Sequence, residues 1–298
     1  MNVSALDEAG PRPRRVAIGT FDGVHLGHRD VIRSSDTVLT FDPHPLAVIA
    51  PHAMPKLLDP LSVKRDLIAG LGVAEMVVIP FDERFARQQA DGFVREVLVG
   101  RLGARHVSVG ENFRFGWRAQ GDAAMLARSP EFDTTVVPLV EVDGETVSSS
   151  RIRALVAAGE VAPAARLLGR PYVLEGVVVH GDGRGRELGM PTANIVPDDA
   201  LVHPGHGVYA AIAEHPGGTH VAAVNVGVRP TFETGRGLLV EPYLIDFSGD
   251  LYGQVLRLHF LERLRGERRF ESAEDLIVQM RADVEEAHRI ASATVLSR

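Results

Sequence analysis

Two histidines three residues apart, His25 and His28, stand in a pattern that suits phosphate chemistry. They close the segment GTFDGVHLGH, residues 19–28, which follows a β-rich run and opens a helical one. At the start of a helix, rings at this spacing can point the same way, and the free backbone amides bind phosphate. Gly23 and Gly27 leave room for a nucleotide to approach the backbone. The segment is therefore typical of a nucleotidyl-transfer site, which needs aligned reactants and hydrogen-bond donors but no protein nucleophile. A glycine-rich turn with two incidental surface histidines is the alternative.

Three further segments could complete such a site. Residues 40–45, TFDPHP, form a rigid loop with polar tips at the end of a predicted strand, although a proline-fixed turn is the simpler interpretation. Residues 110–116, GENFRFG, follow another strand, and their aromatic rings could line a planar ligand or pack in the core. Residues 148–153, SSSRIR, place hydroxyl groups and two arginines at a helix start. That pattern suits a polyphosphate, because the planar arginine fork matches phosphate, and it is equally compatible with a capped helix and solvated arginines.

The second half of the chain carries a different phosphate-binding pattern in residues 181–194, GDGRGRELGMPTAN. Its glycines, together with Arg184 and Arg186, can wrap a phosphate chain with amide and guanidinium groups. Thr192 and Asn194 can present a hydroxyl and an amide oxygen on one side, and such oxygen ligands suit Mg²⁺. A disordered glycine loop followed by an ordinary proline turn is the alternative.

Glu241 is a lone carboxylate in an otherwise apolar predicted strand, between Val240 and Pro242. Such a carboxylate could act as general base on a primary alcohol that attacks the terminal phosphate of ATP. By spacing alone, a glutamate on an edge strand that faces water is the favoured interpretation.

The elements that must position these residues change in kind along the chain. In the first half, five β-rich runs alternate with helical patterns such as 62–71 and 91–102, which predicts a parallel sheet with helices on its faces. These strands are expected at residues 15–20, 37–41, 75–80, 106–110 and 134–139. In such sheets ligands bind beyond the carboxyl ends of the strands, and the motifs of the first half follow Ile18, Leu39 and Val109.

Residues 151–169 are expected to be helical, with Pro163 near the start of a second short helix. From residue 171 on, strands with period-two patterns follow one another without helices between them, which indicates an antiparallel barrel. These strands are expected at residues 172–180, 207–213, 221–226, 238–247 and 254–260. A closing helix follows, with Ser272 as its N-cap and Asp275 three residues later.

Composition limits the classes of protein that fit. The chain has 298 residues, enough for two domains, and a formal net charge of -7. This charge and the absence of a basic stripe argue against a nucleic-acid-binding protein. The sequence has no cysteine, which excludes disulfides and thiolate metal sites and suits a reducing compartment. No apolar run has membrane-spanning length, and residues 1–13 lack a signal-peptide core, so we expect a cytoplasmic protein without a membrane partner.

The first set of motifs resembles the N-terminal adenylyltransferase module of the prokaryotic bifunctional riboflavin kinase/FAD synthetase family. That module has a Rossmann-like α/β fold and is related to the HxGH nucleotidyltransferases. The resemblance implies that His25 and His28 contact the phosphates of ATP. It assigns the other nucleotide and phosphate contacts to Phe21, Asp22, Gly23, Asn112, Ser149 and Arg151. In this chain the connection between HxGH and TFDPHP is shorter than is usual in the family, and Ser150 replaces a threonine.

The second set, which includes GRPY, LGMPTAN, NVGVRPTF, VEPYLIDF and DLYG, resembles the riboflavin kinase module. That module is a six-stranded antiparallel barrel with a C-terminal helix. The resemblance implies that Thr192 and Asn194 bind ATP and Mg²⁺, and that Glu241 is the base for the 5′-hydroxyl group of riboflavin. It assigns no residue to the flavin ring. Glu233 and Thr234 stand where the family commonly has glycines.

Together the motifs predict an α/β plus all-β enzyme, with a Rossmann-like nucleotidyltransferase sheet followed by a six-stranded antiparallel barrel and a terminal helix. Residues 14–160 are expected to form an FMN adenylyltransferase domain and residues 167–298 a riboflavin kinase domain. The expected reactions are phosphorylation of riboflavin to FMN by ATP, and adenylylation of FMN to FAD with release of pyrophosphate. Two alternatives stay open: a riboflavin kinase whose first module is impaired, and a regulator that binds flavin and nucleotide without turnover. The oligomeric state is not predicted.

Overall fold

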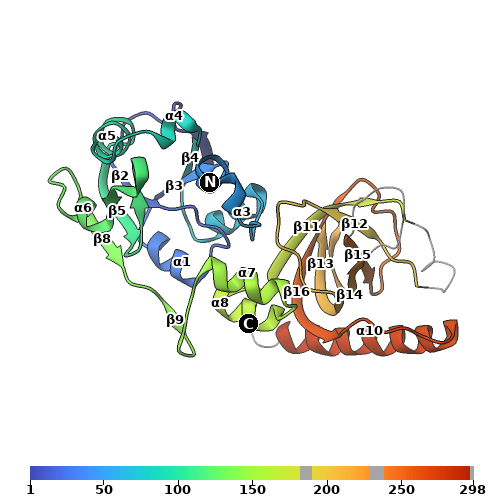
Figure 1. Ribbon diagram of the computed structural model, residues 1–298. Helices are drawn as coiled ribbons and strands as arrows, with labels where there is room; N and C mark the ends of the chain where they lie inside the picture. The colour runs from blue at the N-terminus through green and yellow to red at the C-terminus, as the bar shows by residue number, and fades with distance from the viewer. Residues whose placement is uncertain (182–189, 229–237, 296–298) are drawn as a thin grey trace. The chain divides into compact units, whose positions relative to one another are not determined.

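The structure is a computed structural model that describes residues 1–181, 190–228 and 238–295. The chain divides into two compact units, Met1–Ser149 and Ser150–Arg298 (Figure 1). The first unit is built on a parallel sheet and the second on a closed barrel. The predicted fold class is therefore confirmed, while the domain limits at 14–160 and 167–298 stay a prediction.

The sheet of the first unit has six strands in the order β1-β4-β3-β2-β5-β8, and all neighbouring pairs are parallel. The strands are β1 (Asn2–Ala5), β2 (Arg14–Ile18), β3 (Thr37–Asp42), β4 (Glu75–Pro80), β5 (Ala104–Gly110) and β8 (Asp133–Val137). The five strands expected from the sequence are all present. Strand β1 is an addition at the edge of the sheet, where Asn2 pairs with Glu75.

Short helices and hairpins connect these strands. The helices are α1 (Leu26–Ile32), α2 (Pro45–Ile49), η1 (Pro51–Ala53), α3 (Leu61–Gly70), α4 (Glu83–Ala86), α5 (Ala90–Gly92), η2 (Phe93–Arg101), η3 (Trp117–Ala119) and α6 (Ala123–Ala127). The hairpins pair β6 (Arg114–Phe115) with β7 (Gly121–Asp122), and β9 (Glu141–Val142) with β10 (Glu145–Thr146). The helical patterns at 62–71 and 91–102 correspond to α3 and to α5 with η2.

The parallel sheet is buried on both faces. Successive side chains of a strand point to opposite sides, so neighbouring residues pack in different core clusters. Ile18 of β2 packs in one core cluster with Leu98 of η2. Its neighbour Ala17 packs in the other cluster, with Ile32 of α1 and Ile68 of α3. With both faces covered, the carboxyl edge of the sheet is where polar side chains can meet a ligand.

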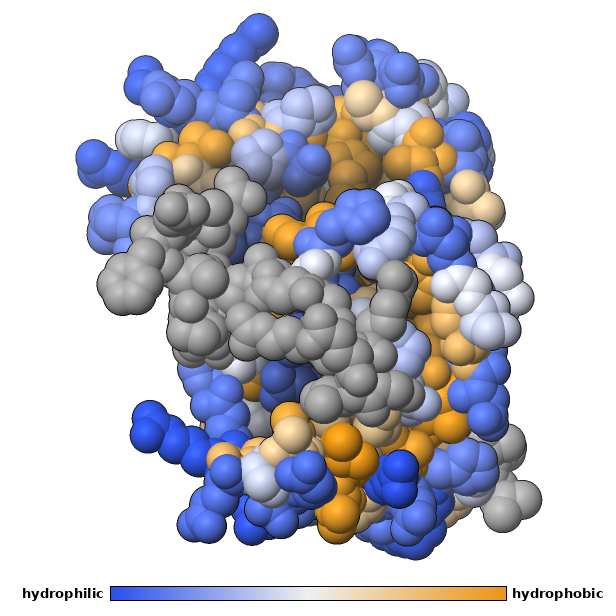
Figure 2. All heavy atoms as spheres, turned by 90° about the vertical axis from the view of Figure 1, so that its right-hand side faces the viewer, coloured by the Kyte–Doolittle hydropathy of each residue, from blue (hydrophilic) through white to orange (hydrophobic). Residues whose placement is uncertain are grey.

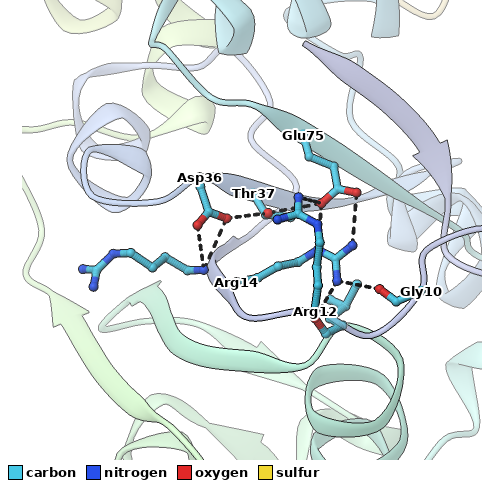
Figure 3. Close-up of polar contacts among 8 residues, drawn as sticks. Gly10, Arg12, Arg14, Asp36, Thr37 and Glu75 are labelled. Atoms are coloured by element: carbon cyan, nitrogen blue, oxygen red, sulfur yellow. Dashed lines mark hydrogen bonds and ion pairs between the residues drawn. The ribbon is translucent and has the colours of Figure 1, made fainter.

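A buried ion pair joins the opposite, amino-terminal ends of β2 and β4 across β3 (Figure 3). Glu75, the first residue of β4, accepts hydrogen bonds from Arg14 Nε at 2.7 Å and from Arg12 Nη2 at 2.8 Å. Arg14 also donates to the carbonyl groups of Gly10 at 2.8 Å and Leu102 at 2.6 Å. The hydrogen bonds from Arg14 hold the pKa of the Glu75 carboxyl below its usual range. Arg14 and Glu75 are both buried. This end of the sheet is therefore occupied by structural contacts.

Glu75→Gln is expected to lower the free energy of unfolding of the first unit by about 3 kcal/mol, because it leaves the buried Arg14 guanidinium without its carboxylate. Trp117 is the one tryptophan of the chain and lies in this unit, so its fluorescence during urea unfolding reports on this unit. Glu83→Gln, at an exposed ion pair with Arg87, is the control and should change the free energy by less than about 0.5 kcal/mol. Equal losses in the two variants would contradict a special role of the buried pair.

In the second unit, helices precede a closed antiparallel barrel with the strand order β11-β12-β15-β14-β13-β16. The helices are α7 (Ser149–Ala157) and α8 (Val161–Leu168), so α8 begins two residues before Pro163. The strands are β11 (Tyr172–Val179), β12 (Asn194–Pro197), β13 (Gly207–His215), β14 (Gly218–Val228), β15 (Leu238–Leu244) and β16 (Val255–Arg265). The five strands expected here are confirmed, and β12, which follows directly on the residues PTA, is the sixth.

Helix α10 (Ala273–Val295) closes the chain and covers part of the outer surface of the barrel. Ala287 and Ile290 of the helix pack against Ala210 and Ala223 of β13 and β14. The helix begins as predicted, because the Ser272 hydroxyl accepts a hydrogen bond from the amide three residues later at 3.1 Å.

Apolar side chains also reach the outer surface of the barrel. Val196, Val177 and Val255 lie in one row across β12, β11 and β16, and all three are exposed. Figure 2, which views the molecule from the right-hand side of Figure 1, shows hydrophobic side chains scattered among hydrophilic ones on that face. None of the helices in the described ranges is long and apolar enough to cross a membrane.

Candidate active sites

The nucleotidyl-transfer motif forms the connection between β2 and α1. Helix α1 begins at Leu26, so His25 stands at its N-cap. The Nδ1 atom of His25 accepts a hydrogen bond from the backbone amide of His28 at 3.3 Å, which satisfies one of the free amides at the helix start. The two imidazole rings stack, with centroids 3.5 Å apart and planes inclined by 17°. Both rings therefore face the same way, as their spacing predicts.

Both imidazoles are held in the neutral form. Burial lowers the pKa of His25 to about 4. Burial also lowers the pKa of His28 well below its usual range, and the charges of His25 and Lys64 add to this effect. Because His25 Nδ1 accepts a hydrogen bond, the single proton of its neutral ring is on Nε2. A neutral ring with its proton on Nε2 is a hydrogen-bond donor, which is what a phosphate oxygen requires.

The turn before the histidines has an unusual backbone that its neighbours hold in place. Phe21 and Val24 have positive φ angles of 49° and 41°, which residues other than glycine rarely adopt. Gly23 has a φ angle of 92°. Phe21 and Asp22 are 1% and 2% exposed, and the Phe21 ring packs edge-on against His28 with centroids 5.4 Å apart. The side chains of Phe21 and Asp22, predicted to line a nucleotide pocket, thus lie within the protein and shape the turn from beneath.

Asp22 is the main anchor of this turn. Its Oδ1 atom accepts a hydrogen bond from the Leu58 amide at 2.8 Å, in the segment before α3. Its backbone carbonyl accepts a hydrogen bond from the Ser149 hydroxyl at 2.9 Å. Ser149 therefore lies next to the histidine turn, as the sequence motifs imply. Arg151, two residues further along α7, belongs to the second unit.

A buried lysine that is not part of the sequence motifs lies at this turn. Lys64 of α3 is 6% exposed, and its Nζ atom donates a hydrogen bond to the carbonyl group of Thr20 at 2.8 Å. A signal was available, because Lys64 lies three and four residues before Leu67 and Ile68 and so occupies their apolar stripe on the predicted helix. A charged residue in such a stripe is buried only where it has a polar partner.

The segment GENFRFG divides into a surface turn and a core strand. Asn112 is exposed in the turn after β5, where the Phe113 amide bonds to the Gly110 carbonyl at 3.0 Å. Phe115 is buried and packs in the core with Phe93 of η2. The core interpretation of these aromatic residues is therefore correct for Phe115.

The lowered pKa of His25 predicts that the first unit loses stability in acid. In the unfolded chain His25 takes up a proton with the ordinary pKa of 6.5, whereas in the folded chain its pKa is about 4. The stability that the neutral His25 ring contributes is therefore fully present above pH 6.5 and is lost as the pH falls toward 4. Between pH 7.5 and pH 5 the loss is about 2 kcal/mol. His25→Asn keeps an N-capping side chain that does not titrate, and it should flatten this pH dependence in urea unfolding followed by Trp117 fluorescence. His52→Asn, at an exposed position, is the control, and a slope equally steep in both variants would contradict the assignment.

In the barrel, Glu241 lies opposite a polar partner on the neighbouring strand. It pairs with Asn225 of β14, whose Nδ2 atom donates to Glu241 Oε2 at 3.5 Å. Strand β15 lies between β12 and β14 in a closed barrel, so the interpretation of Glu241 as an edge-strand residue is wrong. The contact of Asn225 depends on the register of two strands, so the sequence motifs predict no role for this residue.

Asn194 lies beside the same glutamate on the other flanking strand. Ile195 of β12 pairs with Val240 of β15. Two residues earlier, the Ala193 amide donates to the Pro242 carbonyl at 3.0 Å. Asn194 stands between these two links, and directly opposed residues of neighbouring strands share a face. The three polar side chains of Asn194, Glu241 and Asn225 thus form one row across β12, β15 and β14, which we call the polar row.

The residues predicted to bind Mg²⁺ supply neutral oxygen atoms at one end of the polar row. Asn194 is 8% exposed, and Thr192, two residues before it, is half-buried. The backbone of Gly181 lies so close to the Asn194 amide group that a side chain at position 181 would displace this amide. A hydroxyl and an amide oxygen are hard ligands that fit Mg²⁺. Arg184 and Arg186 lie outside the described residues.

Two family models match the chain, one for each unit. A FAD synthetase model matches residues 7–151, and a riboflavin kinase model matches residues 168–291. A bifunctional riboflavin kinase/FMN adenylyltransferase from Listeria monocytogenes is 36% identical over 90% of this chain and 89% of that protein. Proteins of the same name from Bacillus subtilis and Escherichia coli are both 36% identical, over 92% and 90% of this chain and 91% and 90% of their own length.

The chain belongs to the bifunctional riboflavin kinase/FMN adenylyltransferase family. The recognition based on the motifs is therefore confirmed. A crystal structure of a protein named macrolide-efflux protein, from Streptococcus pneumoniae, shares the fold with a TM-score of 0.88 and 29% identity, and the match covers 97% of this chain and 99% of that one. The range matched by the FAD synthetase model includes the histidine turn, and the range matched by the riboflavin kinase model includes the polar row.

Proposed function

We propose that the histidine turn and the polar row carry the two reactions of the bifunctional family, one on each unit. The chain uses ATP to phosphorylate riboflavin to FMN, and it adenylylates FMN to FAD with release of pyrophosphate. The observation that supports this assignment best is the stacked pair of neutral histidines at the start of α1. The short connection after His28 still holds the last four residues of α1, and four further residues lead from the helix into β3. This speaks against the alternative of an impaired first module.

At the histidine turn, a phosphate oxygen of FMN attacks the α-phosphorus of ATP, and the bond to the β-phosphate breaks to release pyrophosphate. Negative charge on the phosphate oxygens is stabilised by the ring N–H groups of His25 and His28 and by the free amides at the start of α1. Neutral imidazoles suit this role because they donate hydrogen bonds without losing a proton. Asn112, Ser149 and Arg151 stay the predicted further contacts to substrate.

At the polar row, Glu241 accepts the proton of the riboflavin 5′-hydroxyl group. The oxygen of this hydroxyl group attacks the γ-phosphorus of ATP, and ADP leaves. Asn225 orients the carboxylate through its hydrogen bond to Oε2. Thr192 and Asn194 are the residues that would hold Mg²⁺, which neutralises charge on the phosphate oxygens of ATP when it is bound. Arg184 and Arg186 stay predicted phosphate contacts, and the cytoplasmic location stays a prediction from the composition.

His28→Ala is expected to reduce FAD formation from FMN and ATP by about 100-fold or more, because it removes a donor to the reacting phosphates. FMN formation from riboflavin by the same preparation should be unchanged, since the polar row lies in the other unit. Both products are measured by separating the flavins on a column. His52→Ala, at an exposed position, is the control. FAD formation within twofold of the unsubstituted chain would refute the assignment of His28.

Glu241→Gln is expected to have the opposite effect, with riboflavin phosphorylation lowered by about 100-fold or more because the proton acceptor is lost. FAD formation from supplied FMN should persist. The control is Glu214→Gln on β13, where the carboxylate contacts His259 at 2.9 Å and lies outside the polar row. If the Glu241 variant phosphorylated riboflavin as fast as this control, Glu241 would not be the base.

A further inference from the structure

We propose that Lys64 is a positioning residue of the FMN adenylyltransferase site, where its buried side chain fixes the histidine turn and places a positive charge behind His28. The inference rests on the proposed function of that turn and goes beyond it, since Lys64 is not one of the motif residues. It acts through the turn, so it is expected to change the rate and pH dependence of FAD formation.

The composition of the chain shows that a lysine at this position is unusual. The sequence contains thirty arginines and two lysines, Lys56 and Lys64. Lys56 is exposed, whereas Lys64 is 6% exposed. In a chain that uses arginine at nearly every other basic position, the buried lysine stands where its compact ammonium group reaches a backbone carbonyl.

The surroundings of Lys64 connect several segments of the site. Its Nζ atom donates to the carbonyl group of Thr20, which also accepts a hydrogen bond from the Thr40 hydroxyl at 3.3 Å. Thr20 immediately precedes the strained turn, and Thr40 belongs to the TFDPHP segment at the end of β3. Lys64 therefore ties α3 to the ends of both β2 and β3.

Three carboxylates balance the charge of Lys64. Burial lowers the pKa of its ammonium group, and the charges of Asp22, Asp59 and Asp42 act in the opposite direction. Asp22 and Asp59 are themselves buried, with exposed fractions of 2% and 1%. Taking an ammonium and two carboxylates out of water is costly. A cluster of apolar side chains would fill the same space without that cost, so the buried charges point to a role beyond packing.

That role follows from the position of His28. Two neighbours can lower the pKa of His28 by their charge: Lys64 on α3, and His25 at the helix start when its ring is protonated. Because His25 is neutral above a pH of about 4, Lys64 is the one of the two that is charged near neutral pH. A positive charge behind His28 favours the neutral ring, which carries a proton to donate but no charge of its own. Without Lys64, His28 would take up a second proton at a higher pH.

The test compares Lys64→Met and Lys64→Arg with Lys56→Met as the exposed control. In the Lys64→Met variant we expect kcat for FAD formation from FMN and ATP to fall tenfold or more, while FMN formation from riboflavin stays within twofold of the unsubstituted chain. The acid limb of the pH profile for FAD formation should move to higher pH in this variant. It should stay in place in Lys64→Arg, which keeps the charge. Lys56→Met should match the unsubstituted chain in every respect.

Three results would overturn the inference. One is a Lys64→Met variant with an unchanged rate and pH profile. Another is a rate that falls with no shift of the acid limb, which would leave Lys64 a purely structural role. The third comes from the unsubstituted protein labelled with ¹³C and ¹⁵N in lysine side chains, which gives two assignable ammonium signals. On addition of ATP the Lys64 signal should shift and the Lys56 signal should stay unchanged. A Lys64 signal that does not shift would show that Lys64 does not belong to the site. Absence of FAD formation by the unsubstituted chain would instead refute the function proposed for the first unit.

Discussion

The hydrogen bond from the His28 amide to His25 Nδ1 ties the chemistry of the first unit to its folding. A protonated His25 could not accept this bond, so the capping of α1 and the neutral state of the ring require each other. The same bond leaves the ring proton on Nε2, and stacking at 3.5 Å places His28 against a neutral neighbour. Folding of the helix start therefore sets both the protonation state and the direction of the donors offered to phosphate.

This bond can form only if the turn before it keeps its strained backbone. Positive φ angles at Phe21 and Val24 cost roughly 1–3 kcal/mol each, and the contacts of Asp22 and Lys64 offset that cost from beneath. The sheet makes these contacts possible, because the ion pair between Arg14 and Glu75 fixes the strands at their amino-terminal ends. Structural polar contacts thus occupy the amino-terminal ends of the strands, and the histidine turn of the proposed adenylyltransferase site follows the carboxyl end of β2.

The sequence predicts those parts of both units whose pattern is long or whose motif is distinctive. Strand β16 alternates buried and less buried side chains, which produces a readable period, whereas β4 is recognised as a short continuous apolar run. The two histidines are recognised by their spacing. The four-residue strands β1 and β12 are too short to show a period. Motif identity places Phe21 and Asp22 at the site but does not show that their side chains are buried. The contact between Asn225 and Glu241 depends on strand register, which no local pattern specifies.

The two sites place their polar groups by different means, and each means suits its reaction. Adenylyl transfer needs donors for phosphate oxygens, and a helix start supplies backbone amides beside two stacked imidazole rings. Phosphorylation of an alcohol needs an acceptor for its proton, and the polar row supplies a carboxylate that stands between two asparagines and accepts a hydrogen bond from one of them, Asn225. Because the barrel is closed, β15 is paired on both sides and its register is fixed. The position of Glu241 is therefore set by the backbone ladder, whereas that of the histidines is set by the side chains beneath their turn.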